Sequence, residues 1–156
     1  MIPDYLAVPA DELGRNSPVR VRVKGDMASI AEDLAESMLA EILQGEESGK
    51  GATLIIPVGP VDHFPILAQM LNEQKISCRN TVFINMDEYL TNDDRWVPTE
   101  HPLSFRGYMD RAFYQLLDPA LAPPPENRVF PDPKKPEAIP QLIASRSGSS
   151  KVGYLS

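Results

Sequence analysis

The 156-residue sequence has few of the residues that crosslink a small protein or bind a metal ion. It contains one cysteine, Cys78, and two histidines, His63 and His101. A single cysteine excludes an internal disulfide bond, which fits a reducing compartment, and we expect a cytoplasmic protein in which Cys78 is a small buried hydrophobe. We predict no bound metal and no cofactor.

Basic residues are also scarce. The chain has 15 Lys and Arg against 22 Asp and Glu, which gives a formal net charge of −7. Because nucleic acids and anionic membranes bind positive patches, this composition argues against both as partners. No apolar run approaches the roughly 18 residues of a transmembrane helix, and the N-terminal sequence lacks the pattern of a secretion signal.

The acidic residues concentrate in one stretch. Residues 26–47 hold seven Asp and Glu and no Lys or Arg. Apolar residues recur there at steps of three and four, which predicts an amphipathic helix with Asp26 as its N-cap and Gly45 as its stop. We interpret the acidic face as solvated, with an acidic docking surface as the alternative.

Prolines cluster in a second stretch. Eight of the 16 prolines lie between Pro119 and Pro140. Three consecutive prolines at positions 123–125 cannot continue a helix or a central strand, so the segment 119–140 is predicted to be an extended connector.

The remaining pattern alternates strands with helices. Continuous apolar runs at 52–57 and 81–86 predict buried strands, 19–24 predicts a half-exposed strand, and 151–156 the start of another. Helices are predicted over 64–71, over 105–117 with Ser104 as the cap, and more weakly over 136–145. This order indicates an α/β fold with a doubly wound parallel sheet, in a single partial domain over 1–156.

Ligands of open parallel sheets bind beyond the carboxyl ends of the strands. Two segments follow predicted strands at that edge. The first is 57–63, which leads into a helix, and the second is 85–89, with the sequence NMDEY. These segments are the candidate site.

The run NMDEY, followed by EHPLSF at 100–105 and by Tyr108 and Met109, resembles the glucosamine-6-phosphate deaminase (isomerase) family. The resemblance extends from about Val19 to the end and is strongest from Thr81 to Phe113. It implies a Rossmann-like fold, here the N-terminal portion of the sugar-phosphate isomerase fold. It also implies conversion of glucosamine 6-phosphate to fructose 6-phosphate and ammonia. A weaker resemblance of residues 94–98 to 6-phosphogluconolactonases leaves a hydrolase as an alternative.

The resemblance assigns roles to individual residues. It makes Asp87 the base that moves a proton from C2 to C1 of the sugar, and we expect this carboxylate to be partly desolvated at the strand end. Glu88 and Tyr89 then support the substrate pocket. The remaining substrate-binding residues correspond to the family's phosphate loop: Val58, Gly59, Pro60 and Val61. Without the resemblance, an Asp-Glu pair after a strand is more simply a helix cap or a solvated loop.

The phosphate loop departs from the family pattern. Pro60 lacks an N–H, Val61 lacks a hydroxyl, and Asp62 adds a negative charge where a phosphate would lie. His63 compensates only if it is protonated, and the alternative is that it simply packs. The family's Asp-Gly-His segment, which opens the sugar ring, is absent from these 156 residues. We therefore expect weak or no activity.

Three further interpretations stay open. One is a non-catalytic binding module derived from the same fold. Another is a homo-oligomer formed by self-association through an exposed sheet edge. The third is a hard-metal site, but the candidate ligands fit no template and a solvated acidic loop is favoured; they are Asp87, Glu88, Asp93, Asp94, Glu100 and His101.

Overall fold

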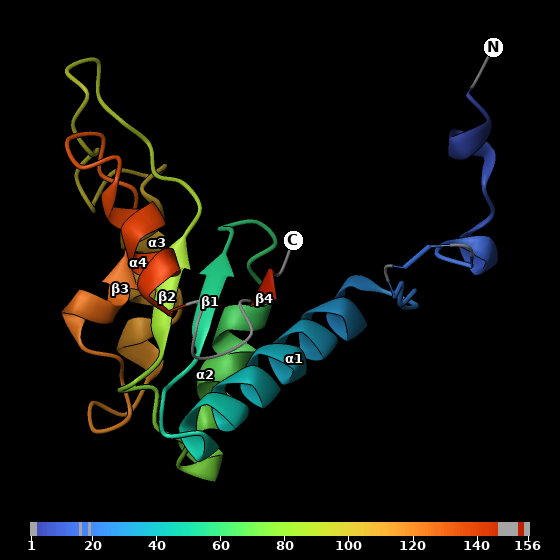
Figure 1. Ribbon diagram of the computed structural model, residues 1–156, viewed down its shortest axis with the longest axis horizontal. Coiled ribbons are helices and arrows are strands. Elements are labelled where there is room, and N and C mark those ends of the chain that lie inside the picture. Colours follow the sequence, from blue (N-terminus) through green and yellow to red (C-terminus); the bar gives the residue numbers. More distant parts are fainter. Residues whose placement is uncertain (1–2, 16, 19, 147–152, 155–156) are drawn as a thin grey trace.

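A four-stranded parallel sheet forms the centre of the computed structural model, which describes residues 3–15, 17–18, 20–146 and 153–154 (Figure 1). The strands lie in the order β3-β2-β1-β4. In chain order they are β1 (Thr53–Ile56), β2 (Val82–Asn85), β3 (Arg128–Val129) and β4 (Gly153–Tyr154). The predicted α/β class and parallel sheet are confirmed.

Helices cover both faces of the sheet. One face is covered by α1 (Met27–Glu47), α2 (His63–Gln74) and α3 (Phe105–Ala112), whose buried side chains pack with Leu54, Ile56 and Phe83. On the other face, α4 (Ala138–Arg146) packs on Ile55 and Ile84, and it lies across the near side of the sheet in Figure 1. Successive strand residues therefore point to opposite covered faces, which explains why the strands read as continuous apolar runs.

The strand order places a topological switch point beside β1. From β1 the chain builds β2 and then β3 on one side, and it returns through α4 to β4 on the other side. The register pairs Ile56 with Asn85, and the Met86 N–H donates to the Ile56 carbonyl at 3.0 Å. The loops after β1 and β2 therefore leave the sheet at the same level, at the edge where such folds bind ligands.

The predicted strand at 19–24 is wrong for the described residues 20–24, and Val19 lies outside the described residues. The segment pairs with no described strand, and Val21 and Val23 are exposed. Its basic side chains instead reach α1, where the Arg22 guanidinium lies 2.9 Å from Asp33 and the Lys24 ammonium 2.7 Å. Together with the short 3-10 helices η1 (Asp4–Ala7) and η2 (Ala10–Glu12), it leads away from the sheet (Figure 1).

The first helix begins as predicted and ends later. The Asp26 carboxylate accepts a hydrogen bond from the Ser29 N–H at 2.7 Å, which confirms it as the N-cap. The prediction that Gly45 stops the helix is wrong, because α1 continues to Glu47 with Gly45 buried. A Cβ at Gly45 would lie 2.3 Å from the Ala52 nitrogen, so this glycine serves the close approach of the chain that enters β1.

The third helix is shorter than predicted. Ser104 caps α3 by accepting from the Gly107 N–H at 3.1 Å, as expected. The helix ends at Ala112, and the chain continues as the 3-10 helix η3 (Tyr114–Leu116). The proline-rich segment then contributes the 3-10 helix η4 (Pro125–Asn127) and the strand β3, which the sequence did not predict. Of the predicted strand at 151–156, only Gly153–Tyr154 lies within the described residues.

Two further observations concern Cys78 and the character of the helices. Cys78 is fully buried, as expected. Among the described residues, no helix has the length and apolar character needed to cross a membrane.

Candidate functional site

The loop after β2 places Asp87 in solvent. Asp87 follows Asn85 and Met86, and its side chain is exposed rather than partly desolvated, which corrects that expectation. The strand ends at Asn85, and only the backbone of the next residue is still tied to β1. Within the described residues the Asp87 carboxylate accepts no hydrogen bond from the protein, so its oxygens are available to an incoming molecule.

Glu88 points the opposite way, into the protein. Its side chain is fully buried and its carboxylate accepts five hydrogen bonds. Three come from the backbone N–H groups of Tyr89, Phe105 and Arg106, at 2.8, 2.9 and 2.9 Å. The other two come from the Ser104 hydroxyl at 3.2 Å and the Arg106 Nε at 3.1 Å. Glu88 therefore binds the otherwise unsatisfied first turn of α3 to the loop after β2.

These bonds also set the protonation of Glu88. Burial by itself raises the pKa of a carboxyl group, but the hydrogen bonds from Arg106, Phe105 and Tyr89 outweigh it and hold the pKa of Glu88 below its ordinary value. The ionised carboxylate has its acceptor positions occupied by protein donors. Glu88 thus fixes the loop that presents Asp87. The partner Arg106 could not be predicted from a local pattern, because it lies 18 residues further along the chain.

Tyr89 completes the loop at the surface. The residue is 44% exposed, and its ring meets the Phe105 ring edge-on, with centroids 5.1 Å apart. Beyond it the chain turns back on itself, since Val97 N–H donates to the Tyr89 carbonyl at 3.0 Å and Leu90 forms an antiparallel bridge with Trp96. The predicted contacts of Glu88 and Tyr89 with substrate stay predictions.

The loop after β1 is built from apolar contacts. Val58 and Val61 are half-buried against the core, whereas Gly59 and Pro60 are exposed and joined by a cis peptide bond. A Cβ at Gly59 would meet nothing within 4 Å. Within the described residues, the N–H groups of Gly59, Val61 and Asp62 have no hydrogen-bond acceptor. The loop thus keeps some of the donors of an anion-binding turn and lacks the one that Pro60 removes.

His63 is a packing residue. It is 3% exposed, its ring lies 4.0 Å from that of Phe64, and its Nδ1 has no hydrogen-bond partner within the described residues. Burial lowers the pKa of His63 to about 4, although the neighbouring Asp62 carboxylate opposes this shift. The ring is therefore neutral near pH 7 and supplies no positive charge to the loop.

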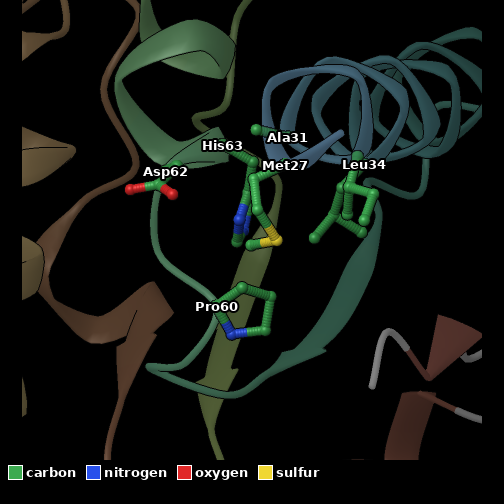
Figure 2. Close-up of a pocket in the computed structure, with 7 residues that line it drawn as sticks. Met27, Ala31, Leu34, Pro60, Asp62 and His63 are labelled. Atoms are coloured by element: carbon green, nitrogen blue, oxygen red, sulfur yellow. The ribbon is translucent and has the colours of Figure 1, made fainter. Parts of the chain in front are cut away.

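A small apolar cavity adjoins this ring. Figure 2 shows His63 and Pro60 facing Met27 and Leu34 at the beginning of α1. The cavity volume is about 10 Å³, which is room for one water molecule at most. Asp62 lies at its margin with an exposed carboxylate and makes no side-chain cap to α2. The net effect at neutral pH is one negative charge in the loop and no nearby protonated histidine.

The acidic loop that follows Tyr89 and carries Asp93 and Asp94 was considered as a metal site. Among residues 3–15, 17–18, 20–146 and 153–154, no three His, Cys, Asp or Glu side chains lie close enough to bind one ion. Asp93 instead pairs with Arg95 at 3.0 Å, and both are exposed. Asp94 adopts a left-handed backbone with φ of 53°, at the turn of this loop.

The chain is similar to known proteins in both sequence and fold. Over 65 residues, 40% of this chain, the sequence is 34% identical to a glucosamine-6-phosphate deaminase of Erwinia tasmaniensis, of which the match covers 23%. The fold is similar to that of a monomeric glucosamine-6-phosphate deaminase, with a TM-score of 0.66 and 20% identity over 83% of this chain and 52% of that one. The chain thus spans about half of that solved structure and under a quarter of the curated relative. No protein-family model matches it.

Proposed function

Since the chain resembles glucosamine-6-phosphate deaminases in both sequence and fold, we propose that it carries residues of a sugar-phosphate site in which Asp87 is the proton-transfer base. The observation that supports this most is the opposed direction of two neighbouring carboxylates. Glu88 is buried and occupied, whereas Asp87 is held in solvent at the carboxyl end of β2, beside the switch point.

The proposed step is an isomerisation followed by loss of an amine. In the open-chain form of glucosamine 6-phosphate, the Asp87 carboxylate takes the proton from C2 and returns it to C1, while one amine proton passes to O1, so that C1 becomes an alcohol and C2 an imine. The resulting C2 imine is hydrolysed by water, which yields fructose 6-phosphate and ammonia. A carboxylate suits this step because it accepts and returns a proton at a fixed position.

The loop after β1 is proposed to contact the phosphate. The N–H groups of Gly59, Val61 and Asp62 at the start of α2 suit an anion, and the Asp62 carboxylate opposes it. At about 4 Å, two unit charges of like sign repel by ~1 kcal/mol in water and by more in a protein-like medium. We therefore expect weak phosphate binding and slow or absent turnover by these 156 residues.

The test is a thermal-shift titration with glucosamine 6-phosphate and fructose 6-phosphate, beside an assay of ammonia release. A ligand at ~100 times its dissociation constant stabilises the fold by about 2.7 kcal/mol. Asp87→Asn is expected to remove ammonia release while keeping the melting temperature of the free protein, because the exposed carboxylate makes no contact that stabilises the fold. The matched control Asp93→Asn removes an exposed carboxylate from the next loop and keeps the activity.

Two outcomes count against the proposal. If neither sugar phosphate shifts the melting temperature up to millimolar concentration, the site does not bind this substrate class, and a non-catalytic binding module is the better description. If the parent chain releases ammonia and Asp87→Asn releases it at the same rate as Asp93→Asn, Asp87 is not the base.

A lactonase-type hydrolase is the second candidate. The observation in its favour is a cavity of about 310 Å³ in which Arg95, Arg106 and Lys134 face Asp94 and Asp132. Arg106 is paired with Glu88 and Arg95 with Asp93, so Lys134, which forms no ion pair within the described residues, is the cation most available to a phosphorylated sugar acid. Hydrolysis of 6-phosphogluconolactone that is lost in Arg95→Gln and kept in Asp87→Asn would favour this function over the deaminase.

A further inference from the structure

A second cavity lies on the side of Trp96 and Arg106 that adjoins the proline-rich segment. Its volume is about 250 Å³, and none of the residues predicted to bind sugar phosphate lines it. The side chains that matter most for its chemistry are two arginines, one aspartate and three aromatic residues: Arg106, Arg128, Asp110, Trp96, Tyr114 and Phe130. The cavity is thus charged on part of its wall and aromatic on the rest.

Arg128 enters this cavity as a fixed cation. Its guanidinium lies over the Tyr114 ring at 4.5 Å, and its Nε and Nη2 both donate to the Pro123 carbonyl, at 3.0 and 2.8 Å. No carboxylate among the described residues lies within 4.0 Å of it. A half-buried guanidinium without a counter-ion is uncommon in folded proteins, because burying an unpaired charge is unfavourable.

Arg106 is held in the same manner. Its guanidinium lies over the Trp96 ring at 4.5 Å, its Nε donates to Glu88, and its Nη2 donates to the Val97 carbonyl at 2.5 Å. For both arginines, the Nη1 group makes no hydrogen bond within the described part of the chain. Both guanidinium groups are therefore held by stacking and by bonds to carbonyl oxygens, and Arg106 also by its ion pair with Glu88. Each has an Nη1 group without a hydrogen-bond partner in the described residues.

We propose that this cavity binds a small organic carboxylate whose body is flat and apolar. The charge of Arg106 is balanced by the buried Glu88, whereas Arg128 has no carboxylate within 4.0 Å among the described residues. The wall therefore offers one unpaired guanidinium, which suits one carboxylate group better than a doubly charged phosphate. Guanidinium donors suit carboxylate oxygens, and the Trp96 and Phe130 rings, with Pro125, offer apolar surface to the rest of the ligand. Because the arginines are already fixed, little side-chain ordering opposes binding.

This inference does not depend on the proposed sugar-phosphate site. The cavity is formed by the loop before α3, by α3 and η3, and by the segment around β3, and Asp87 is not among its lining residues. Trp96 is the only tryptophan of the chain and lines this wall. Its fluorescence therefore reports occupancy without a label.

The test is a titration of the whole 156-residue chain with benzoate, followed by tryptophan fluorescence and confirmed by calorimetry. Benzamide, which has the same shape without the charge, is the matched control ligand. We expect saturable benzoate binding with a dissociation constant of about 1 mM or tighter, and at least ~10-fold weaker binding of benzamide. Inorganic phosphate is expected to bind more weakly than benzoate.

Three variants separate this cavity from its neighbour. Arg128→Gln is expected to weaken benzoate binding at least ~10-fold, since a charge-assisted hydrogen bond is lost. Asp110→Asn is expected to strengthen it about threefold, because the wall then loses its one negative charge. Arg95 lines the cavity of about 310 Å³ described under the proposed function and does not line this one. Arg95→Gln is therefore expected to leave benzoate binding unchanged.

The opposite signs of the first two variants keep the test decisive, because general damage to the fold would weaken both. The inference is overturned if benzoate and benzamide bind equally, if neither binds, or if Asp110→Asn weakens binding as Arg128→Gln does. A loss of benzoate binding in Arg95→Gln would assign the ligand to the adjoining cavity and overturn it as well.

Discussion

The loops after β1 and β2 leave one edge of the sheet side by side, yet they are stabilised by different means. The loop after β2 depends on a buried carboxylate with five donors, and it carries the exposed Asp87 near its beginning. The loop after β1 depends on half-buried valines and on a buried neutral histidine, and its one charged side chain, Asp62, faces solvent. One loop is fixed by directional bonds and the other by packing.

The difference bears on the two halves of the proposed site. The hydrogen bonds at Glu88 hold the neighbouring residue Asp87 in place, as a preorganised site requires. Packing around His63 fills the place next to the start of α2 with apolar atoms and leaves no cation for an anion. Under the proposed function, Asp87 is therefore the better preserved part of the site and the phosphate contact the weaker part.

The strongest test of this comparison is Glu88→Gln. The amide cannot accept all five hydrogen bonds, and it leaves the Arg106 guanidinium without its carboxylate. We expect the free energy of unfolding to fall by ~3 kcal/mol, which corresponds to a melting temperature lower by roughly 6–12 °C in a protein of this size. Calorimetry measures it.

Glu100→Gln is the control, because Glu100 lies in the same region with an exposed side chain and its carboxylate accepts from the Thr99 hydroxyl. We expect its melting temperature to match that of the parent protein. Equal melting temperatures for Glu88→Gln and Glu100→Gln would show that the loop after β2 is not fixed by this carboxylate.

The second test is the pH dependence that His63 imposes. Its pKa is about 4 in the folded protein and near the ordinary 6.5 when unfolded. Between these values the unfolded chain binds more protons, so stability is highest above pH 6.5 and falls as the pH drops toward 4. The slope approaches ~1.4 kcal/mol per pH unit within this window.

His63→Gln is expected to flatten the stability profile between pH 6.5 and 4.5, measured by urea unfolding at several pH values. His101→Gln, at the exposed second histidine, is expected to keep the slope. A parent protein whose stability does not change across this window would contradict the buried, neutral state of His63.

The third test restores a feature of an anion-binding loop. Asp62→Ser removes the negative charge and adds a hydroxyl at the start of α2. Removing a repulsion of ~1 kcal/mol is expected to tighten binding of glucosamine 6-phosphate about fivefold, as measured by calorimetry. Asp11→Ser makes the same charge change in the N-terminal segment and is expected to leave affinity unchanged; an equal gain there would assign the effect to overall charge.

The smallest expected effect concerns the contact between Tyr89 and Phe105. A double-mutant cycle with Tyr89→Leu and Phe105→Leu is expected to give a coupling energy of about 0.5 kcal/mol, since the ring pair is partly exposed. Denaturant unfolding measures each corner of the cycle. A coupling energy of zero would mean that the ring contact adds nothing to the fixation of the loop by Glu88.

Local patterns predicted the fold where the cause is local. The strands β1 and β2 were recognisable because both faces are covered, and Asp26 and Ser104 because a cap acts within three residues. The strand β3 was missed because Arg128 and Val129 lie among prolines and gain their strand partner only from β2. The strand prediction for residues 20–24 was wrong for the opposite reason: the residues alternate as in a strand, but no described strand lies beside them to pair with.

The candidate site divides in the same way. The motif NMDEY and its likeness to known deaminases could be found without coordinates, and so could the charge conflict at Asp62. The exposure of Asp87, the burial of Glu88 and the neutral state of His63 could not. The state of Glu88 depends on atoms contributed by α3, and that of His63 on atoms contributed by α1. The pairing of Arg106 and Arg128 around one cavity is likewise invisible in a linear sequence.

The sequence by itself thus determined the α/β class, the main helices and strands, the negative charge and the motif after β2, since these follow from the order and spacing of side chains. Tertiary structure decided which carboxylate faces solvent, where Gly45 lies and which cations share a cavity. The physical reason is that burial and hydrogen-bond partners are set by segments distant in sequence, and these determine whether a polar group is charged, occupied or free to bind.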